Sequence, residues 1–308
     1  MKQPKILTFD KLPCKIRIHI KKENGILEKN LKTILVFICF VFSAALHSQS
    51  IDSLKAVLEN APPEKQFDIL NAISEKTMFS DPKTSLQYAE KAYEIARKSN
   101  DEKLLLDIFD NLTEANLHLG HPEIAEDYCK KALQVAEKSK INRELAFYYG
   151  LMGIVFMKSE DFNKSLFYFN KALEIEKKHN FDRMMATTLN NIGTANLKLG
   201  KMDLALEYFL KSLRIKEKVG NEKQIAISLL NIGSFLIRQK KYEEAEQYLN
   251  RSYKILQKLD LKIRMADLLS LQSVVYREMG LFPEAEKKLK KLIEIREAIG
   301  NRREKAKT

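Results

Sequence analysis

Asn190-Asn191-Ile192-Gly193 opens the stretch of sequence on which the fold depends, and Ala205, Tyr208 and Phe209 follow it at fixed spacing. Leu230-Asn231-Ile232-Gly233 repeats this opening forty residues later, and Gly153 stands forty residues before Gly193. A constant period of this size is the signature of a solenoid built from one recurring supersecondary unit. The stretch therefore predicts a repeat protein.

Two columns of similar side chains extend this register along the chain. The first column holds small residues, at Ser85, Ala125, Ser165, Ala205, Ala245 and Ala285. The second holds Tyr88, Tyr128, Tyr168, Tyr208 and Tyr248. Small residues let two helices approach closely where they cross, and large neighbours fill the space between them. The columns predict six units of about forty residues over residues 64–300.

Each unit has the pattern of helix, short turn and helix, so we expect an all-α fold. In the fourth unit the first helix is expected over residues 184–199, because Gly200 suits the residue just past a helix end. Residues 49–63 are expected to form a lead-in helix that stops at Pro62-Pro63, and residues 301–308 a basic tail. In the last unit Ser273 breaks the glycine column formed by Gly153, Gly193 and Gly233, and Lys288 breaks the tyrosine column, so we expect both to face water at the end of the array.

Composition favours a folded helical protein, with 45% hydrophobic and 31% charged residues, only 10 glycines and 7 prolines. The formal charge is +12, and half of it comes from residues 1–32, which hold nine basic and three acidic residues. Beyond that segment the two signs are interleaved, without a basic stripe carrying aromatic residues. We therefore expect no nucleic-acid partner.

The leader, residues 1–48, contains an apolar run at 34–46 that follows Lys29 and Lys32. A positive flank and a short apolar core are typical of a signal peptide, whereas a spanning helix needs about 20 residues. We expect an exported protein, located in the periplasm or at the cell surface. The long charged segment before the core leaves an alternative, an uncleaved inner-membrane anchor with the repeats outside the cytoplasm. Membrane contact is expected through this segment alone.

The residues that recur most regularly resemble the motif of the tetratricopeptide repeat family, namely Leu189, Ile192, Gly193, Gly200, Ala205, Phe209 and Ser212. The resemblance covers residues 64–300 and implies a right-handed superhelical solenoid of antiparallel helix pairs. The period of forty is longer than the family's usual 34, and no proline ends the second helix. The chain is in this respect similar to the long-repeat branch found in exported bacterial repeat proteins and in sensor modules.

The first helix of each unit has a second, more polar side. In the family this side lines a concave groove, so the resemblance implies that it binds a partner. The candidate residues are Asn71, Asn111, Asn190, Asn191, Thr194, Lys198, Asn231, Ser234 and Arg238. Asparagine both donates and accepts hydrogen bonds, which would suit the backbone of an extended peptide. The alternative is that these asparagines merely solvate a helix face or cap a neighbouring unit.

Neither a nucleophile with its base nor a phosphate-binding glycine loop is present, so we expect no enzyme. His118 and His121 lack a supporting cluster of cysteines or carboxylates, so we expect no metal and no cofactor. The sequence predicts an exported scaffold or adaptor that binds a protein or peptide. The alternative is an extracytoplasmic sensory module, related to repeat-containing histidine kinases or transcription regulators but without an output domain.

Overall fold

The computed structural model describes residues 6–7, 18–19, 50–99 and 101–305, and their secondary structure is helical apart from two short strands. The chain divides into two compact units, Met1–Ser139 and Lys140–Thr308, which we describe separately. Strands β1 (Ile6–Leu7) and β2 (Ile18–His19) pair antiparallel in the first unit. The predicted signal peptide lies outside the described residues.

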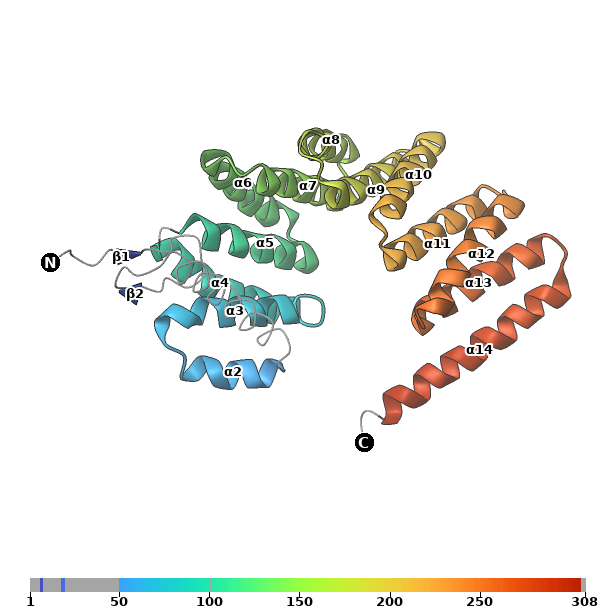
Figure 1. Ribbon diagram of the computed structural model, residues 1–308, viewed down its shortest axis with the longest axis horizontal. Helices are drawn as coiled ribbons and strands as arrows, with labels where there is room; N and C mark the ends of the chain where they lie inside the picture. Colours follow the sequence, from blue (N-terminus) through green and yellow to red (C-terminus); the bar gives the residue numbers. More distant parts are fainter. Residues whose placement is uncertain (1–5, 8–17, 20–49, 100, 306–308) are drawn as a thin grey trace, which may run out of the picture. The chain divides into compact units, whose positions relative to one another are not determined.

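The first unit contains a short helix followed by two helix pairs (Figure 1). These helices are α2 (Ile51–Glu59), α3 (Pro63–Thr77), α4 (Pro82–Ser99), α5 (Glu102–Leu119) and α6 (Pro122–Ser139). The hydroxyl of Ser50 caps α2 by accepting a hydrogen bond from the Ser53 amide at 3.2 Å. Leu54 of α2 is fully buried against Ile69 and Ile73 of α3. The predicted lead-in helix thus covers the outer side of the first pair.

The second unit contains four helix pairs in chain order. Their helices are α7 (Asn142–Lys158), α8 (Phe162–Lys178), α9 (Asp182–Lys198), α10 (Met202–Val219), α11 (Glu222–Arg238), α12 (Tyr242–Lys258), α13 (Lys262–Glu278) and α14 (Phe282–Lys305). Helix α14 continues past Gly300 to Lys305, so the predicted basic tail begins within this helix.

Consecutive helices pack on each other within both units, and in the second unit the closest packing lies inside each pair. The all-α fold and the solenoid of sequential helix pairs are thereby confirmed for the described residues. We call the first helix of each pair helix A (α3, α5, α7, α9, α11 and α13) and the second helix B (α4, α6, α8, α10, α12 and α14).

The turns between helices share one backbone conformation every twenty residues. A positive φ occurs at Gly120, Lys140, Glu160, Asn180, Gly200, Gly220, Lys240, Asp260 and Gly280. After Gly200 the Lys201 amide donates to the Asn196 carbonyl at 2.9 Å, which is the helix-ending bond of a Schellman motif. Because a positive φ occurs in both turns of each unit from Gly120 to Gly280, the forty-residue unit there contains two structurally similar halves.

Where helix A and helix B of a pair cross, a small residue on one helix faces a larger residue on the other. A Cβ atom added at Gly193 would lie 2.7 Å from the ring of Phe209, and one at Gly153 would lie 2.5 Å from Phe169. At the crossing of α5 and α6 in the first unit the two facing side chains are closer in size. Thr113 contacts Cys129 there, with 3.8 Å between Oγ1 and Sγ. Where helix A carries glycine, a large side chain of helix B therefore fills the crossing, whereas Thr113 and Cys129 fill theirs with two side chains of similar size.

The expectation that Ser273 faces water is wrong. Ser273 lies in the glycine column of α13, on the side that α14 covers, and is 8% exposed. Its hydroxyl donates to the Ser270 carbonyl at 2.7 Å, so the polar group is satisfied within its own helix. Lys288 is half-buried, with its ammonium 5.3 Å from the ring centroid of Tyr253.

Candidate functional site

Two of the predicted binding residues, Asn71 and Asn111, meet between helices α3 and α5 in the first unit. The Asn111 side-chain amide donates to the Asn71 carbonyl oxygen at 2.8 Å, and the Asn71 amide donates to Glu75 Oε1 at 2.8 Å. Asn111 is buried, with 5% of its surface exposed. The two amides therefore bond to each other across neighbouring A helices.

The other predicted residues lie on α9 and α11 in the second unit. Three of them are half-buried on these helices, Asn190, Asn191 and Thr194, as is Ser234. The remaining residues, Lys198, Asn231 and Arg238, are exposed. Thr194 donates its hydroxyl to the Asn190 carbonyl at 3.0 Å. Among the described residues no hydrogen bond joins Asn191 to Asn231, so this part of the predicted stripe is more open to a partner.

The first unit carries an acidic face that the sequence analysis did not single out. It consists of Asp68 and Glu75 on α3 with Asp107, Asp110 and Glu114 on α5. The residues recur at helical spacings of three, four and seven, which places them on the same side of their helices. This spacing could have revealed the acidic face from the sequence. Asp110 and Glu114 stand in the second repeat where the predicted polar stripe has Asn190 and Thr194 in the fourth.

Asp110 is the least compensated member of the acidic face. Burial, with further contributions from Glu114, Glu75 and Asp107, raises the pKa of Asp110 to about 7. Its Oδ1 atom is buried and has no hydrogen-bond partner. A buried acceptor without a donor costs free energy, which further disfavours the ionised form of Asp110.

The other carboxyl groups of the acidic face are shifted in the same direction. Partial removal from water raises the pKa of Asp68, Asp107 and Glu114. Lys103 opposes this shift for the two aspartates. His118 opposes it for Glu114, and its ring packs edge-on against Phe79 with 5.1 Å between centroids. Phe79 is 81% exposed, so an apolar side chain borders the acidic face.

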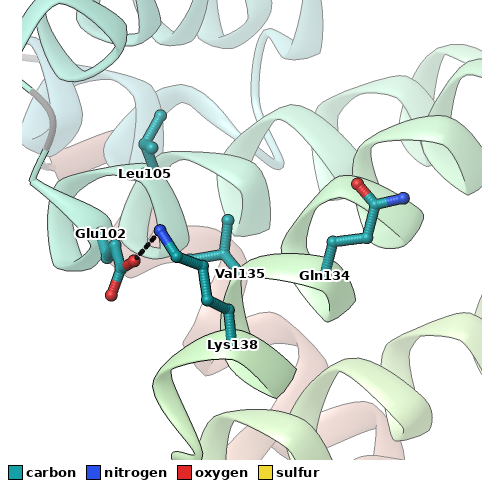
Figure 2. Close-up of a pocket in the computed structure, with 5 residues that line it drawn as sticks. All are labelled: Glu102, Leu105, Gln134, Val135 and Lys138. Atoms are coloured by element: carbon teal, nitrogen blue, oxygen red, sulfur yellow. Dashed lines mark ion pairs between the residues drawn. The ribbon is translucent and has the colours of Figure 1, made fainter.

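A shallow pocket of about 300 Å³ lies between α5 and α6, lined by Glu102, Leu105, Gln134, Val135 and Lys138 (Figure 2). Lys138 Nζ pairs with Glu102 Oε1 at 2.9 Å, as the dashed line in Figure 2 shows. Ion pairs at the same 36-residue spacing join Lys218 to Asp182 and Lys258 to Glu222 in the second unit. The pocket is therefore a product of repeat packing and has no special chemistry.

The second unit contains a buried carboxyl group between α8 and α9. Glu176 is 1% exposed, and its Oε1 accepts a hydrogen bond from the Thr188 hydroxyl at 2.8 Å. Its Oε2 has no partner, and burial raises the pKa of Glu176 to about 7. Forty residues later Lys216 donates to the Ser228 hydroxyl at 2.7 Å. Such pairs fill junctions between repeats and are not accessible to a substrate.

The described residues offer little to catalysis or to metal binding. Cys129 is fully buried, and burial raises the pKa of its thiol to about 12, so it is no nucleophile near neutral pH. In the described part of the chain, histidine, cysteine and acidic residues form no group of three or more that could hold a metal ion. The described helices include none with the length and apolarity to cross a membrane.

Comparison with known proteins gives family matches over the second unit. Models described as tetratricopeptide repeat match residues 148–179, 184–258 and 224–298. No curated protein sequence matches the chain.

Solved structures with a similar fold include BtubC (BKLC) from P. vanneervenii, which is 20% identical with a TM-score of 0.60. That match covers 74% of this chain and 92% of BtubC. Aspartyl phosphate phosphatase F from Bacillus subtilis is 14% identical with a TM-score of 0.62, covering 90% of this chain and 85% of that one. The Rap conjugation gene regulator of plasmid pLS20, in complex with the Phr* peptide, is 16% identical with a TM-score of 0.56. The match covers 78% of this chain and 76% of that regulator. At these identities the likeness is one of fold.

Proposed function

We propose that the chain, whose residues 148–179 and 184–298 match tetratricopeptide repeat models, is a scaffold that binds a protein or peptide along its A helices. The pLS20 regulator, which shares the fold, was solved in complex with a peptide. The exposed sides of the A helices carry polar and charged residues in both units, whereas their other sides form the core. These surfaces are suited to recognising an extended or helical segment.

We propose further that the acidic face of the first unit receives a basic segment. The observation that carries this proposal is the buried and unpartnered Oδ1 of Asp110, together with the three carboxyl groups that act on Asp110, those of Glu75, Asp107 and Glu114. A lysine or arginine placed there would supply the missing donor and reduce the repulsion among the carboxylates. Phe79 would offer an apolar contact to the stem of such a side chain.

Catalysis is not part of the proposed function. The phosphatase compared above shares the fold, and an identity of 14% carries no activity across to this chain. We assign no reaction to the acidic face. Binding therefore accounts for the geometry without a reaction.

The binding proposal can be tested with a defined probe, a fluorescent octalysine peptide measured by anisotropy. We expect saturable binding that weakens with added salt. A variant carrying Asp107→Asn, Asp110→Asn and Glu114→Gln should bind at least about tenfold more weakly, which corresponds to ~1.4 kcal/mol. The control is Glu90→Gln with Glu94→Gln, which removes two exposed carboxylates of α4 outside the acidic face. Equal losses in both variants, or no binding to the wild type, would contradict the proposal.

The natural partner can be sought by cross-linking mass spectrometry in the native cell. Cross-links from Lys103 to a basic segment of a partner, lost in the triple variant, would support the acidic face as the site. Cross-links that survive the triple variant and map to α9 and α11 would instead favour the stripe containing Asn191 and Asn231. This stripe stays our proposed second contact surface.

We also propose export, on the strength of the apolar run at residues 34–46 and the basic residues before it. N-terminal sequencing of the native protein tests this directly. A mature chain that begins near residue 49 would support cleavage. A native chain that retains residue 1 would contradict cleavage and leave the anchor as the alternative.

A further inference from the structure

The outer side of α14 carries an apolar stripe that nothing described in the structure covers. Phe282, Leu289 and Ile293 are 66%, 45% and 55% exposed. Their spacings of seven and four residues place them on one side of the helix. The adjacent side of α14 buries Ala285 and Leu292. Helix α14 is thus apolar on two sides.

The repeat register shows what covers this stripe elsewhere in the protein. In the earlier repeats the position of Leu289 is occupied by residues that are at most 9% exposed, namely Ala89, Cys129, Phe169, Phe209 and Leu249. The position of Ile293 holds Leu133, Leu173 and Leu213, which are at most 9% exposed, and also Tyr93 and Tyr253, which are half-buried. In the second unit, the position of Leu289 is therefore buried in each repeat that another repeat follows.

Helix A of the next repeat provides that cover. Phe209 of α10 meets Phe235 of α11 edge-on, with 6.1 Å between ring centroids. Phe169 and Leu173 of α8 form one cluster with Leu189 and Ile192 of α9. An amphipathic helix with apolar residues at spacings of three and four thus closes each junction.

We propose that the stripe formed by Phe282, Leu289 and Ile293 docks an amphipathic α-helix of another protein, in the place that a seventh helix A would take. The interface would continue the stacking that already joins α10 to α11 and α12 to α13. This surface lies in the second unit and is separate from the acidic face of the first, so either proposal can fail alone.

A second copy of the chain fits the stripe less well. End-to-end stacking would require a copy to present the outer side of its first helix A. In this protein α2 already covers that side, with Leu54 fully buried against α3. The outward residues of α2 include Asp52, Lys55 and Glu59, which would place charges against the stripe.

The probe for this proposal is a fluorescent peptide with the sequence of α11, residues 222–238, because α11 covers the equivalent stripe of α10. We expect saturable binding to the full chain, with an increase in peptide helicity on binding. The double variant Leu289→Glu and Ile293→Glu should weaken binding at least about tenfold, equivalent to ~1.4 kcal/mol. A peptide in which Ile232 and Leu236 are replaced by Asp should not bind.

The control is Phe167→Glu, which places one glutamate at an aromatic residue of α8 that is 54% exposed. Peptide binding should be unchanged in this variant, and circular dichroism should show native helicity in both variants. Binding that is insensitive to the double variant, or lost equally in the control, would overturn the proposal. Sedimentation velocity adds a second readout. Self-association abolished by the double variant would overturn it in favour of a second copy.

Discussion

Gly193 of α9 lies directly against the ring of Phe209 in α10, where an added Cβ atom would come within 2.7 Å of two ring carbons and 3.1 Å of the Ala205 carbonyl oxygen. Any side chain at position 193 would therefore overlap the ring of Phe209 in its present position. The pair occupies the crossing point of helix A and helix B in the fourth repeat, and Gly153 and Phe169 form the same contact in the third.

Gly193→Ala should destabilise the protein although alanine favours helix. Helix propensity would add about 1 kcal/mol, but overpacking against Phe209 should cost about 1–3 kcal/mol. Gly150→Ala is the control, because a Cβ atom at Gly150 of α7 meets nothing within 4 Å. It should raise stability by roughly 0.5–1 kcal/mol. Urea denaturation followed by circular dichroism measures both changes.

The double variant Gly193→Thr and Phe209→Cys should recover part of the loss caused by Gly193→Thr alone. It reproduces the pair Thr113 and Cys129 of the second repeat, in which the two side chains share the crossing more evenly. We expect a favourable coupling of about 0.5–3 kcal/mol in a double-mutant cycle. If the changes in unfolding free energy of the two single variants simply add in the double variant, the two side chains do not share one space between the helices.

Gly200→Ala should destabilise the turn of the fourth repeat by about 1–2 kcal/mol, because the residue has a φ of +74° and alanine disfavours that conformation. Nothing lies within 4 Å of a Cβ at this position, so the cost comes from the backbone alone. Amide hydrogen exchange should show faster opening at the end of α9. Unaltered exchange there would contradict this account of the turn.

Replacing Glu176 and Thr188 together by leucine should leave stability unchanged or raise it by about 1–4 kcal/mol at pH 8. The variant mimics Leu256 and Leu268, which are both fully buried two repeats later. Thr188→Val alone should lower stability, since Glu176 would lose its hydrogen-bond donor. Denaturation midpoints of the three proteins test this order.

Asp110→Asn should stabilise the protein at pH 8 and have little effect at pH 4. The folded pKa of about 7 lies above the ordinary value of 3.8, so folding favours the neutral acid. Ionisation weakens the fold progressively as the pH rises from about 4 to 7. The expected gain at pH 8 is about 1–4 kcal/mol, measured by denaturation at both pH values.

Asp81→Asn provides a comparison with the opposite sign. Hydrogen bonds from Thr84 lower the pKa of Asp81, so its ionised form favours the folded state. The stabilising contribution is present above the ordinary pKa and is lost as the pH falls through the lowered value. The substitution should therefore reduce stability at pH 8, and a gain there would contradict the assigned hydrogen bonds.

Much of the fold could be read from the sequence because it rests on local periodicity. The forty-residue register located the helix pairs, and Gly193 was correctly placed at the packed side of its helix. The even spacing of positive φ values could not be predicted from the sequence, because only four of the nine positions are glycine. Lys140, Asn180 and Asp260 adopt the same turn because the packed helices on either side require it.

The candidate site was less accessible to sequence reasoning. Asn71 and Asn111 were expected to face a partner, and they bond to each other between adjacent helices. The acidic face was overlooked because its members are separated by up to 46 residues, from Asp68 to Glu114. Only the packing of α3 beside α5 brings them close enough to raise one another's pKa values.

The sequence by itself determined the repeat, the helix pairs and the small residues at their crossings, because these follow from spacings of three, four and forty residues. Tertiary structure alone decided which polar side chains are already satisfied and which are left without a partner. Asp110 and Asn111 are neighbours in sequence, yet one has an unpaired buried oxygen and the other a bonded amide. That difference depends on the atoms of α3 across the interface, and no local pattern encodes it.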